Sequence, residues 1–308
     1  MDTSCQSIAP HSSSFSISPG ELAARMGRAD APWLLDVRPG AAFDESPRLL
    51  AGAQRCAPQD VAAFASAHPP REVVVYCVYG HKVSEDAAAT LRAAGWNACK
   101  LAGGMAGGEP GVDAAPDLAQ WRAQAPLTLR KRPDWGVTGK QPSRWITRER
   151  PKIDRIACPW LIRRFIDPQA QFFYVPTPQV LPEAKRLQAV AYDMPGAPVS
   201  HDGELCSFDA LLLGFDLNAA SFPQLATLAR IVRGADTDCL ALSAQSAGLL
   251  AFSLGLSRLH ADDDHAMLEA AMPLYDALYA WCQSAQDEPH SWQPEASTNV
   301  TKVTRAGQ

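Results

Sequence analysis

The sequence predicts two domains, an α/β domain built on a parallel sheet and a second, mostly helical α+β domain. The chain has 308 residues, which is more than one domain usually contains. Strand-like and helix-like segments alternate up to about residue 125, as in parallel sheets flanked by helices. A stretch rich in proline and glycine follows, and beyond residue 207 the apolar residues recur with helical spacing.

These observations divide the chain into five parts. We expect a polar tail without fixed structure at 1–15, the first domain at 16–125 and a linker at 126–142. The second domain should occupy 143–285, and a second polar tail 286–308.

The composition is that of a soluble globular protein. Hydrophobic residues make up 47% of the chain and charged residues 20%, which is enough to form real cores. The net charge of −5 argues against a general coat for nucleic acids. No apolar run approaches the roughly 18 residues of a membrane helix, and the polar N-terminus lacks the apolar core of a secretory signal. The 8 cysteines are scattered without a CxxC pair, so we expect reduced thiols and a cytoplasmic protein.

The sequence of the first domain predicts three helices that alternate with three strands. A helix should start at Ser18-Pro19 and run to Met26, because serine caps helices and proline suits the first helical position. The remaining elements follow from β-favouring runs and from helix caps and breakers. They are a strand at Trp33–Arg38, a helix at Pro58–Ala67, a strand at Val73–Tyr76, a helix at Glu85–Ala94 capped by Ser84, and a strand at Asn97–Leu101.

Cys77 is the strongest chemical signal of the chain. It lies between the end of a buried strand and the start of a helix, and Gly80 allows the backbone to bend between them. Helix and loop amides at such a place stabilise a thiolate or a bound anion. His81 and Lys82 add positive charge that is expected to lower the pKa of the thiol. The alternative is that Cys77 is a small apolar residue that closes the strand.

Two further polar residues end the neighbouring strand. Asp36 and Arg38 follow the apolar run Trp33–Leu35. Ligands of parallel sheets bind beyond the carboxyl ends of the strands. We therefore expect Asp36 and Arg38 to share a site with Cys77.

This first part resembles the rhodanese sulfurtransferases over residues 18 to 122. The resemblance is carried by Asp36-Val37-Arg38, by the loop Cys77-x-x-Gly80 and by the turn Gly103-Gly104-Met105. It implies that Cys77 is a nucleophile that takes sulfane sulfur from a donor such as thiosulfate and passes it to a thiol. The amides of the loop (Val78, Tyr79, Gly80, His81 and Lys82) would bind the anion, with Asp36 and Arg38 as supporting residues. The family often has a hydroxyl residue six positions after the cysteine, where this chain has Val83, followed by Ser84.

A basic segment joins the two domains. Residues 130 to 164 contain 11 lysines and arginines against 3 acids, in a chain that is acidic as a whole. Such a segment is either a surface for an anion or DNA, or a solvated linker that continues into one basic helix face.

The second domain begins with the apolar helical segment 153–166. Proline fits best in the first turn of a helix, so we expect the helix to start at Pro159, with Cys158 before it. Strands are expected at Gln171–Val175 and Val190–Asp193. Four helices should follow, with the last one kinked or split at Pro273: Phe208–Leu213, Phe222–Val232, Ser243–Leu259 and Asp263–Ser284.

The loop between the second strand and the next helix has unusual chemistry. Asp193, His201 and Cys206 offer an oxygen, a nitrogen and a sulfur that could bind a divalent metal, although the spacing matches no standard zinc motif. In the alternative, Cys206 is buried and His201 is an exposed loop residue. Arg233 and Asp236 are expected to pair with Asp154 and Arg155.

This second domain resembles the C-terminal region of ChrB-type chromate resistance proteins over residues 143 to 285. The resemblance is carried by three motifs: Arg150-Pro151-Lys152-Ile153-Asp154-Arg155-Ile156-Ala157-Cys158-Pro159-Trp160, His201-x-Gly203-Glu204-x-Cys206-x-Phe208-Asp209 and Arg233-Gly234-Ala235-Asp236. It implies a role in chromate resistance, and some members regulate an efflux operon. Asp154, Arg155, Glu204 and Asp236 become candidate site residues of this domain.

Together these features predict a sulfurtransferase that works through a persulfide on Cys77 and is linked to chromate or thiol-oxidant stress. Sulfur transfer needs no cofactor, whereas the second domain is a candidate for a divalent metal. The expected partners are a small sulfur donor, a thiol acceptor and chromate, which is a tetrahedral dianion like thiosulfate. The alternative is a chromate-responsive regulator, in which the rhodanese-like domain senses and the basic segment contacts DNA.

Overall fold

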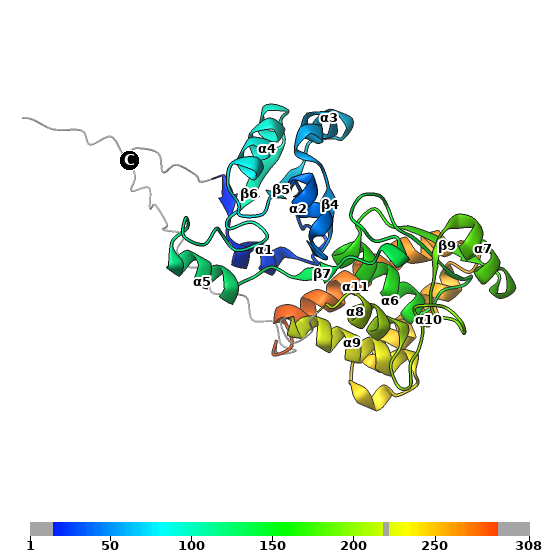
Figure 1. Cartoon of the computed structure of the whole chain (residues 1–308). Coiled ribbons are helices and arrows are strands. Elements are labelled where there is room, and N and C mark those ends of the chain that lie inside the picture. The colour runs from blue at the N-terminus through cyan, green and yellow to red at the C-terminus, as the bar shows by residue number, and fades with distance from the viewer. Residues whose placement is uncertain (1–14, 218–221, 289–308) are drawn as a thin grey trace, which may run out of the picture.

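The computed structural model describes residues 15–217 and 222–288. The two predicted tails, 1–15 and 286–308, lie almost wholly outside the described residues. None of the described helices is long and apolar enough to cross a membrane. The N-terminal sheet with its helices and the helix-rich C-terminal half are the two main parts of Figure 1.

The first part is built on a parallel sheet of five strands in the order β1-β6-β5-β2-β4. In this sheet β2 lies beside β5, and Asp36 is paired in register with Tyr76, the residue before Cys77. The strands are β1 (Ser16–Ile17), β2 (Trp33–Asp36), β4 (Ala53–Arg55), β5 (Glu72–Tyr76) and β6 (Asn97–Leu101). The α/β prediction is confirmed, and the three long strands lie within a residue or two of their expected positions.

Helices cover both faces of this sheet. Side chains alternate between the faces of a strand, so Val73, Val75 and Cys77 point to one face, while Val74 and Tyr76 point to the other. The first face is covered by α3 (Val61–Ala67) and α4 (Lys82–Ala93), and the second by α1 (Pro19–Arg25) and α2 (Gly40–Glu45). A short 3₁₀ turn, η1 (Pro58–Asp60), leads into α3, and α5 (Ala115–Ala123) follows β6.

The predicted linker is folded against both parts. Its strand β7 (Thr128–Arg130) pairs antiparallel with β3 (Arg48–Leu50), and a 3₁₀ turn, η2 (Pro133–Trp135), follows. The ring of Trp135 is buried edge-on against Trp145 and Phe215 of the second part. Apolar burial therefore holds a segment whose composition suggested a free connection.

The second part combines a three-stranded parallel sheet with helices. The sheet has the order β10-β8-β9, with β8 at Arg144–Arg148, β9 at Gln171–Val175 and β10 at Val190–Ala191. The helices are α6 (Asp154–Leu161), continued by the π-turn η3 (Ile162–Ile166), α7 (Val180–Leu187), α8 (Ser207–Gly214), α9 (Pro223–Asp236), α10 (Ser246–Leu259) and α11 (Asp264–Ser284). Two 3₁₀ turns, η4 (Thr177–Gln179) and η5 (Leu240–Leu242), complete the domain. The expectation of a mostly helical α+β domain is confirmed.

The prediction for Pro159 was wrong, because α6 begins at Asp154 and runs through Pro159 instead of starting there. At Pro273 the last helix is not split, since α11 is continuous through this residue. Proline in a helix deprives the carbonyl four residues earlier of its amide donor. At Pro159 that carbonyl belongs to Arg155, and the Tyr192 hydroxyl donates a hydrogen bond to it at 3.1 Å. A donor from a distant strand end thus replaces the missing amide.

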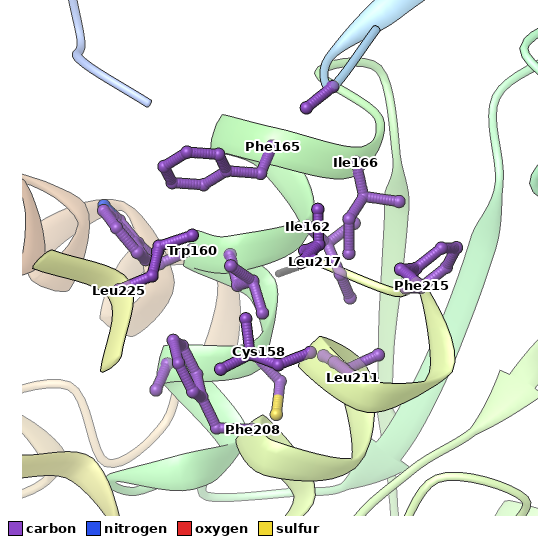
Figure 2. Packing of buried hydrophobic residues seen from close by; sticks show 14 of the residues in the cluster. Cys158, Trp160, Ile162, Phe165, Ile166, Phe208, Leu211, Phe215, Leu217 and Leu225 are labelled. Atoms are coloured by element: carbon purple, nitrogen blue, oxygen red, sulfur yellow. The ribbon is translucent and has the colours of Figure 1, made fainter. Parts of the chain in front are cut away.

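One hydrophobic core connects the two parts. It contains the α1-side face of the first sheet together with the apolar faces of α6, α8, α9 and α11. Figure 2 shows Cys158, Trp160 and Phe165 of α6 and η3 among residues of α8 and α9 such as Phe208 and Leu225. Phe165 also reaches the first part, where a Cβ added to Gly27 would lie 2.0 Å from its ring. The two domains therefore pack against each other through a shared core and are not separated by a free linker.

Candidate functional site

Cys77 lies where the sequence places it, directly after β5 and one loop before α4. Its thiol is on the face covered by α3 and α4, and the residue is only 4% exposed. The loop Val78–His81 then leads to the N-terminus of the 12-residue helix α4. A group on this sulfur would face the positive end of the helix dipole.

The loop amides are available for an anion. Among the described residues, the amides of Val78, Tyr79, Gly80, His81 and Lys82 have no hydrogen-bond acceptor. The loop is held by its carbonyls instead, since the amides of Met105 and Ala106 donate to the carbonyl oxygens of Cys77 and Val78 at 2.9 and 2.8 Å. Free amides in a loop before a helix N-terminus are the kind of groups that bind anions.

The predicted cap of α4 was wrong in an informative way. The helix begins at Lys82, and Ser84 lies buried in its first turn rather than before it. The Ser84 hydroxyl lies 3.3 Å from the sulfur of Cys77 and 3.0 Å from the carbonyl oxygen of His81, to which it donates. Ser84 thus supplies the hydroxyl that the family often carries one position earlier, because the early start of α4 turns this side chain towards the sulfur.

The two basic residues of the loop face acids rather than the sulfur. His81 Nε2 lies 2.9 Å from Asp113, and Nδ1 lies 3.5 Å from Glu109. Lys82 pairs with Asp86 one turn along the helix. Neither side chain therefore supplies its positive charge to the sulfur, and His81 fixes the loop against the segment before α5.

Asp36 and Arg38 form a buried ion pair on the other face of the sheet. The guanidinium of Arg38 binds the carboxylate of Asp36 at 2.6 Å, and the hydroxyl of Tyr76 donates to the same carboxylate at 2.8 Å. Because Tyr76 and Cys77 are consecutive in a strand, their side chains point to opposite faces. Asp36 and Arg38 therefore do not share a site with Cys77, and their ion pair stabilises the opposite face of the sheet.

The other cysteines of the domain stand apart from this chemistry. All seven cysteines within the described residues are free thiols. Burial raises the pKa of Cys56 to about 11 and also raises the pKa of Cys99. Thiols with raised pKa values are poor nucleophiles, so the structure gives neither of them the anion-binding environment of Cys77.

A cavity of about 330 Å³ opens beside the loop. Tyr79, Gly80 and His81 line one wall, and Lys100 and Trp121 line another. The indole N–H of Trp121 is buried and has no hydrogen-bond acceptor among the residues that the structure describes. The cavity borders the loop that follows Cys77, but Cys77 itself is not among the residues that line it.

The turn at Gly104 lies so close to the Cys77 loop at Gly80 that a substitution there should lower the stability of the protein. Gly104 has φ of 56°, and a Cβ there would meet the amide nitrogen of Gly80 at 2.4 Å and the carbonyl oxygen of Cys77 at 2.6 Å. Gly104→Ala should therefore destabilise the protein by roughly 3 kcal/mol, through backbone strain and a clash that displaces the Cys77 loop. Gly111 has φ of 82° and open space around it, so Gly111→Ala should cost only about 1 kcal/mol. Urea unfolding measures both, and equal losses would contradict the packing argument.

A second cluster of polar residues lies in the C-terminal part. His201 Nε2 lies 3.1 Å from Asp236, 3.3 Å from Asp193 and 3.7 Å from Asp154. Asp193 also pairs with Arg148 at 2.9 Å and Arg155 at 3.2 Å. His201 and Asp193 come together as predicted, and Asp154, Asp236 and Arg155 join them.

Cys206 is not part of this cluster. Its thiol is buried and donates to Asp209 at 3.4 Å, and it stands at the N-cap of α8. Burial raises the pKa of this thiol, so it does not supply a ready thiolate for a metal. Arg233 pairs with Asp209 at 2.6 Å rather than with Asp154, and Glu204 is exposed outside the cluster. Asp154 and Asp236, which are distant from His201 in the sequence, thus lie beside it where we expected Cys206.

The carboxylates of this cluster are strongly perturbed. Burial, together with the nearby Asp236 and Asp193, raises the pKa of Asp154 to about 8. Burial and Asp193 also raise the pKa of Asp236. Shifts of this kind mark places where negative charges are held together against their electrostatic preference. The sequence pointed here through the polar loop of Asp193 and His201 and through the motifs that contain Asp154 and Asp236.

Fold and site together define a class. A parallel α/β sheet that presents a cysteine in an amide-lined loop before a helix is the framework of a rhodanese-like domain. The family models agree: residues 18–109 match the Rhodanese-like domain, and residues 145–282 match ChrB, C-terminal domain. The chain therefore consists of a rhodanese-like domain followed by a ChrB C-terminal domain.

Individual relatives cover parts of the chain. Protein ChrB of Cupriavidus metallidurans is 33% identical over 172 residues, which are 52% of this chain and 51% of that protein, so the chain spans about half the length of this relative. A rhodanese homolog of Thermus thermophilus is 29% identical, with a TM-score of 0.20, over 24% of this chain and 78% of its own. Protein hp1203 of Helicobacter pylori is 18% identical, with a TM-score of 0.26, and the match covers 38% of this chain and 89% of that protein.

Proposed function

We propose that the protein is a sulfurtransferase that carries sulfane sulfur as a persulfide on Cys77. The observation that carries this proposal is the position of one sulfur atom. The thiol of Cys77 lies 3.3 Å from the Ser84 hydroxyl, inside a loop whose amides have no acceptor of their own among the described residues. Free amides beside the sulfur favour its charged form, and the Ser84 hydroxyl can stabilise a thiolate once it turns from the carbonyl oxygen of His81 to the sulfur.

The chemistry proceeds in two displacements. The Cys77 thiolate attacks the sulfane sulfur of thiosulfate, the sulfur–sulfur bond of the donor breaks, and sulfite leaves with the bonding electron pair. The outer sulfur of the persulfide is then attacked by an acceptor thiolate, and the Cys77 thiolate leaves. In both steps the loop amides and the dipole of α4 stabilise the negative charge on sulfur.

The second domain supports a link between this chemistry and chromate resistance. Its likeness to ChrB supports a role in resistance to chromate or to thiol oxidants, for which thiolates and persulfides are suitable reductants. Chromate is a tetrahedral dianion like thiosulfate, so the Cys77 loop is a candidate for binding it as well.

The regulator alternative rests on the basic segment 130–164. In the structure, six of its eleven cations are engaged in internal ion pairs: Arg132, Lys140, Arg148, Arg155, Arg163 and Arg164. Lys131 is bound to the carbonyl oxygen of Phe43 and lies over its ring. Paired cations contribute little to a surface that attracts the phosphates of DNA, so we favour the enzyme.

Mass spectrometry tests the proposed intermediate directly. After incubation with thiosulfate and removal of the excess, the full chain should gain one sulfur atom, and peptide mapping should place it on Cys77. Cys99→Ser is the matched control, and it should gain the sulfur as the wild type does. A chain that remains unmodified, or that takes up the sulfur on another cysteine, contradicts the proposal.

A further inference from the structure

We propose that Asp154, Asp193, His201 and Asp236 bind one divalent metal ion of the class that accepts both carboxylate oxygen and imidazole nitrogen, such as Mn²⁺ or Zn²⁺. The proposal is independent of the sulfur chemistry at Cys77.

The first observation is convergence. The four side chains come from separate segments: the first residue of α6, the residues after β10, the loop before α8 and the last residue of α9. One ligand atom each from Asp154, Asp193 and His201 lies within 4.8 Å of the others, and Asp236 lies 3.1 Å from the same imidazole nitrogen. Donor atoms at such spacings can share one ion at ligand distances of about 2.0–2.2 Å after small side-chain rotations.

The second observation is that contacts behind the carboxylates fix their orientation. The amides of Ser207 and Phe208, at the N-terminus of α8, donate to Asp154 at 2.7 and 3.0 Å, and the thiol of Cys158 donates to it at 3.2 Å. Arg148 and Arg155 hold Asp193 from the other side. Partners that orient ligands from behind are a general feature of metal centres.

The third observation is that Asp154 and Asp236 have few positively charged partners. The carboxylate of Asp154 has no exposed surface, and within the described ranges 15–217 and 222–288 the one basic side chain within 4.0 Å of it is His201. The same holds for Asp236, because Arg148 and Arg155 both contact Asp193. His201 is thus the one basic group beside two carboxylates, and a fully buried carboxylate without a cation is stable only when it holds a proton. A divalent cation provides the second positive charge and allows His201 to act as a neutral ligand.

The ligand set decides the class of metal. Three carboxylates and one imidazole suit borderline and hard divalent ions. The nearest thiols are turned away from such a role, since Cys158 donates to Asp154 and Cys206 donates to Asp209. The His201 side chain is 39% exposed, which gives an ion a path from the solvent.

The test uses the full chain after removal of metals with a chelator. Mn²⁺ is titrated while the free ion is followed by electron paramagnetic resonance, and the melting temperature is measured with and without the ion. We expect one bound Mn²⁺ per chain, displacement by Zn²⁺ and a higher melting temperature. His201→Ala and Asp236→Asn should each weaken binding by roughly tenfold or more.

Two control variants make the result specific. Glu204→Gln lies on the same loop outside the cluster and should bind Mn²⁺ as the wild type does, as should Cys77→Ser in the other domain. A wild type without saturable Mn²⁺ or Zn²⁺ binding overturns the proposal and leaves His201 as the imidazolium partner of the aspartates. Binding that survives in both His201→Ala and Asp236→Asn also overturns it.

Discussion

Replacing Cys77 with serine should lower kcat/KM for thiosulfate-dependent sulfur transfer by about 10³-fold or more, to the background rate. Serine cannot form a persulfide, and its hydroxyl is not ionised in the way a stabilised thiolate is. The fold should be unaffected, because serine is close in size to cysteine and its hydroxyl can still bond to Ser84. Transfer from thiosulfate to cyanide or to a thiol measures the loss.

Cys56→Ser and Cys99→Ser are the matched controls for this result. Both thiols are shielded by burial, which raises their pKa values, so these variants should keep most of the activity. Equal rates for the wild type and Cys77→Ser would remove the proposed mechanism. A loss in Cys56→Ser as large as in Cys77→Ser would mean that the structure assigns the wrong nucleophile.

Replacing Arg38 with methionine should destabilise the protein by about 3 kcal/mol or more, because the carboxylate of Asp36 remains buried without its main charge partner. The exposed fraction of the two side chains is 3% for Arg38 and 0% for Asp36. Arg55 is too far away to compensate fully, at 4.0 Å from the same carboxylate. Methionine preserves much of the packing against Phe43 and Tyr76, so the loss reports mainly the charge. Urea denaturation measures the change in the free energy of unfolding.

Arg25→Met provides the comparison. The ion pair between Arg25 and Glu72 lies in the same domain, but its side chains are 31% and 39% exposed. Exposed pairs are worth at most about 1 kcal/mol, so this variant should lose much less stability than Arg38→Met. If the two variants unfold at the same urea concentration, the buried pair is not the support that the structure indicates.

Local patterns were enough to predict the first domain and the position of Cys77 between a strand and a helix. The strand Val73–Tyr76, Cys77, Gly80 and the following helix are contiguous, so the chemistry of the loop is encoded in about twenty residues. The glycine turn at Gly103–Gly104 was also readable, since only glycine fits where two backbones meet this closely. Alternation, glycine and caps are short-range signals, and they act through the local backbone.

The sequence alone therefore determined the α/β sheet, the helical second domain and the position of Cys77 at the end of β5. Only the tertiary structure decided which face each polar side chain occupies and which distant residues meet. It placed Asp36 and Arg38 opposite the thiol, started α4 early enough to bring Ser84 to the sulfur, and let Tyr192 replace the donor that Pro159 lacks. It also showed that Asp154 and Asp236, rather than Cys206, lie beside His201. The physical reason is that these contacts join segments up to some eighty residues apart. The packing of the shared core sets the relative position of such segments, and no local sequence pattern encodes that position.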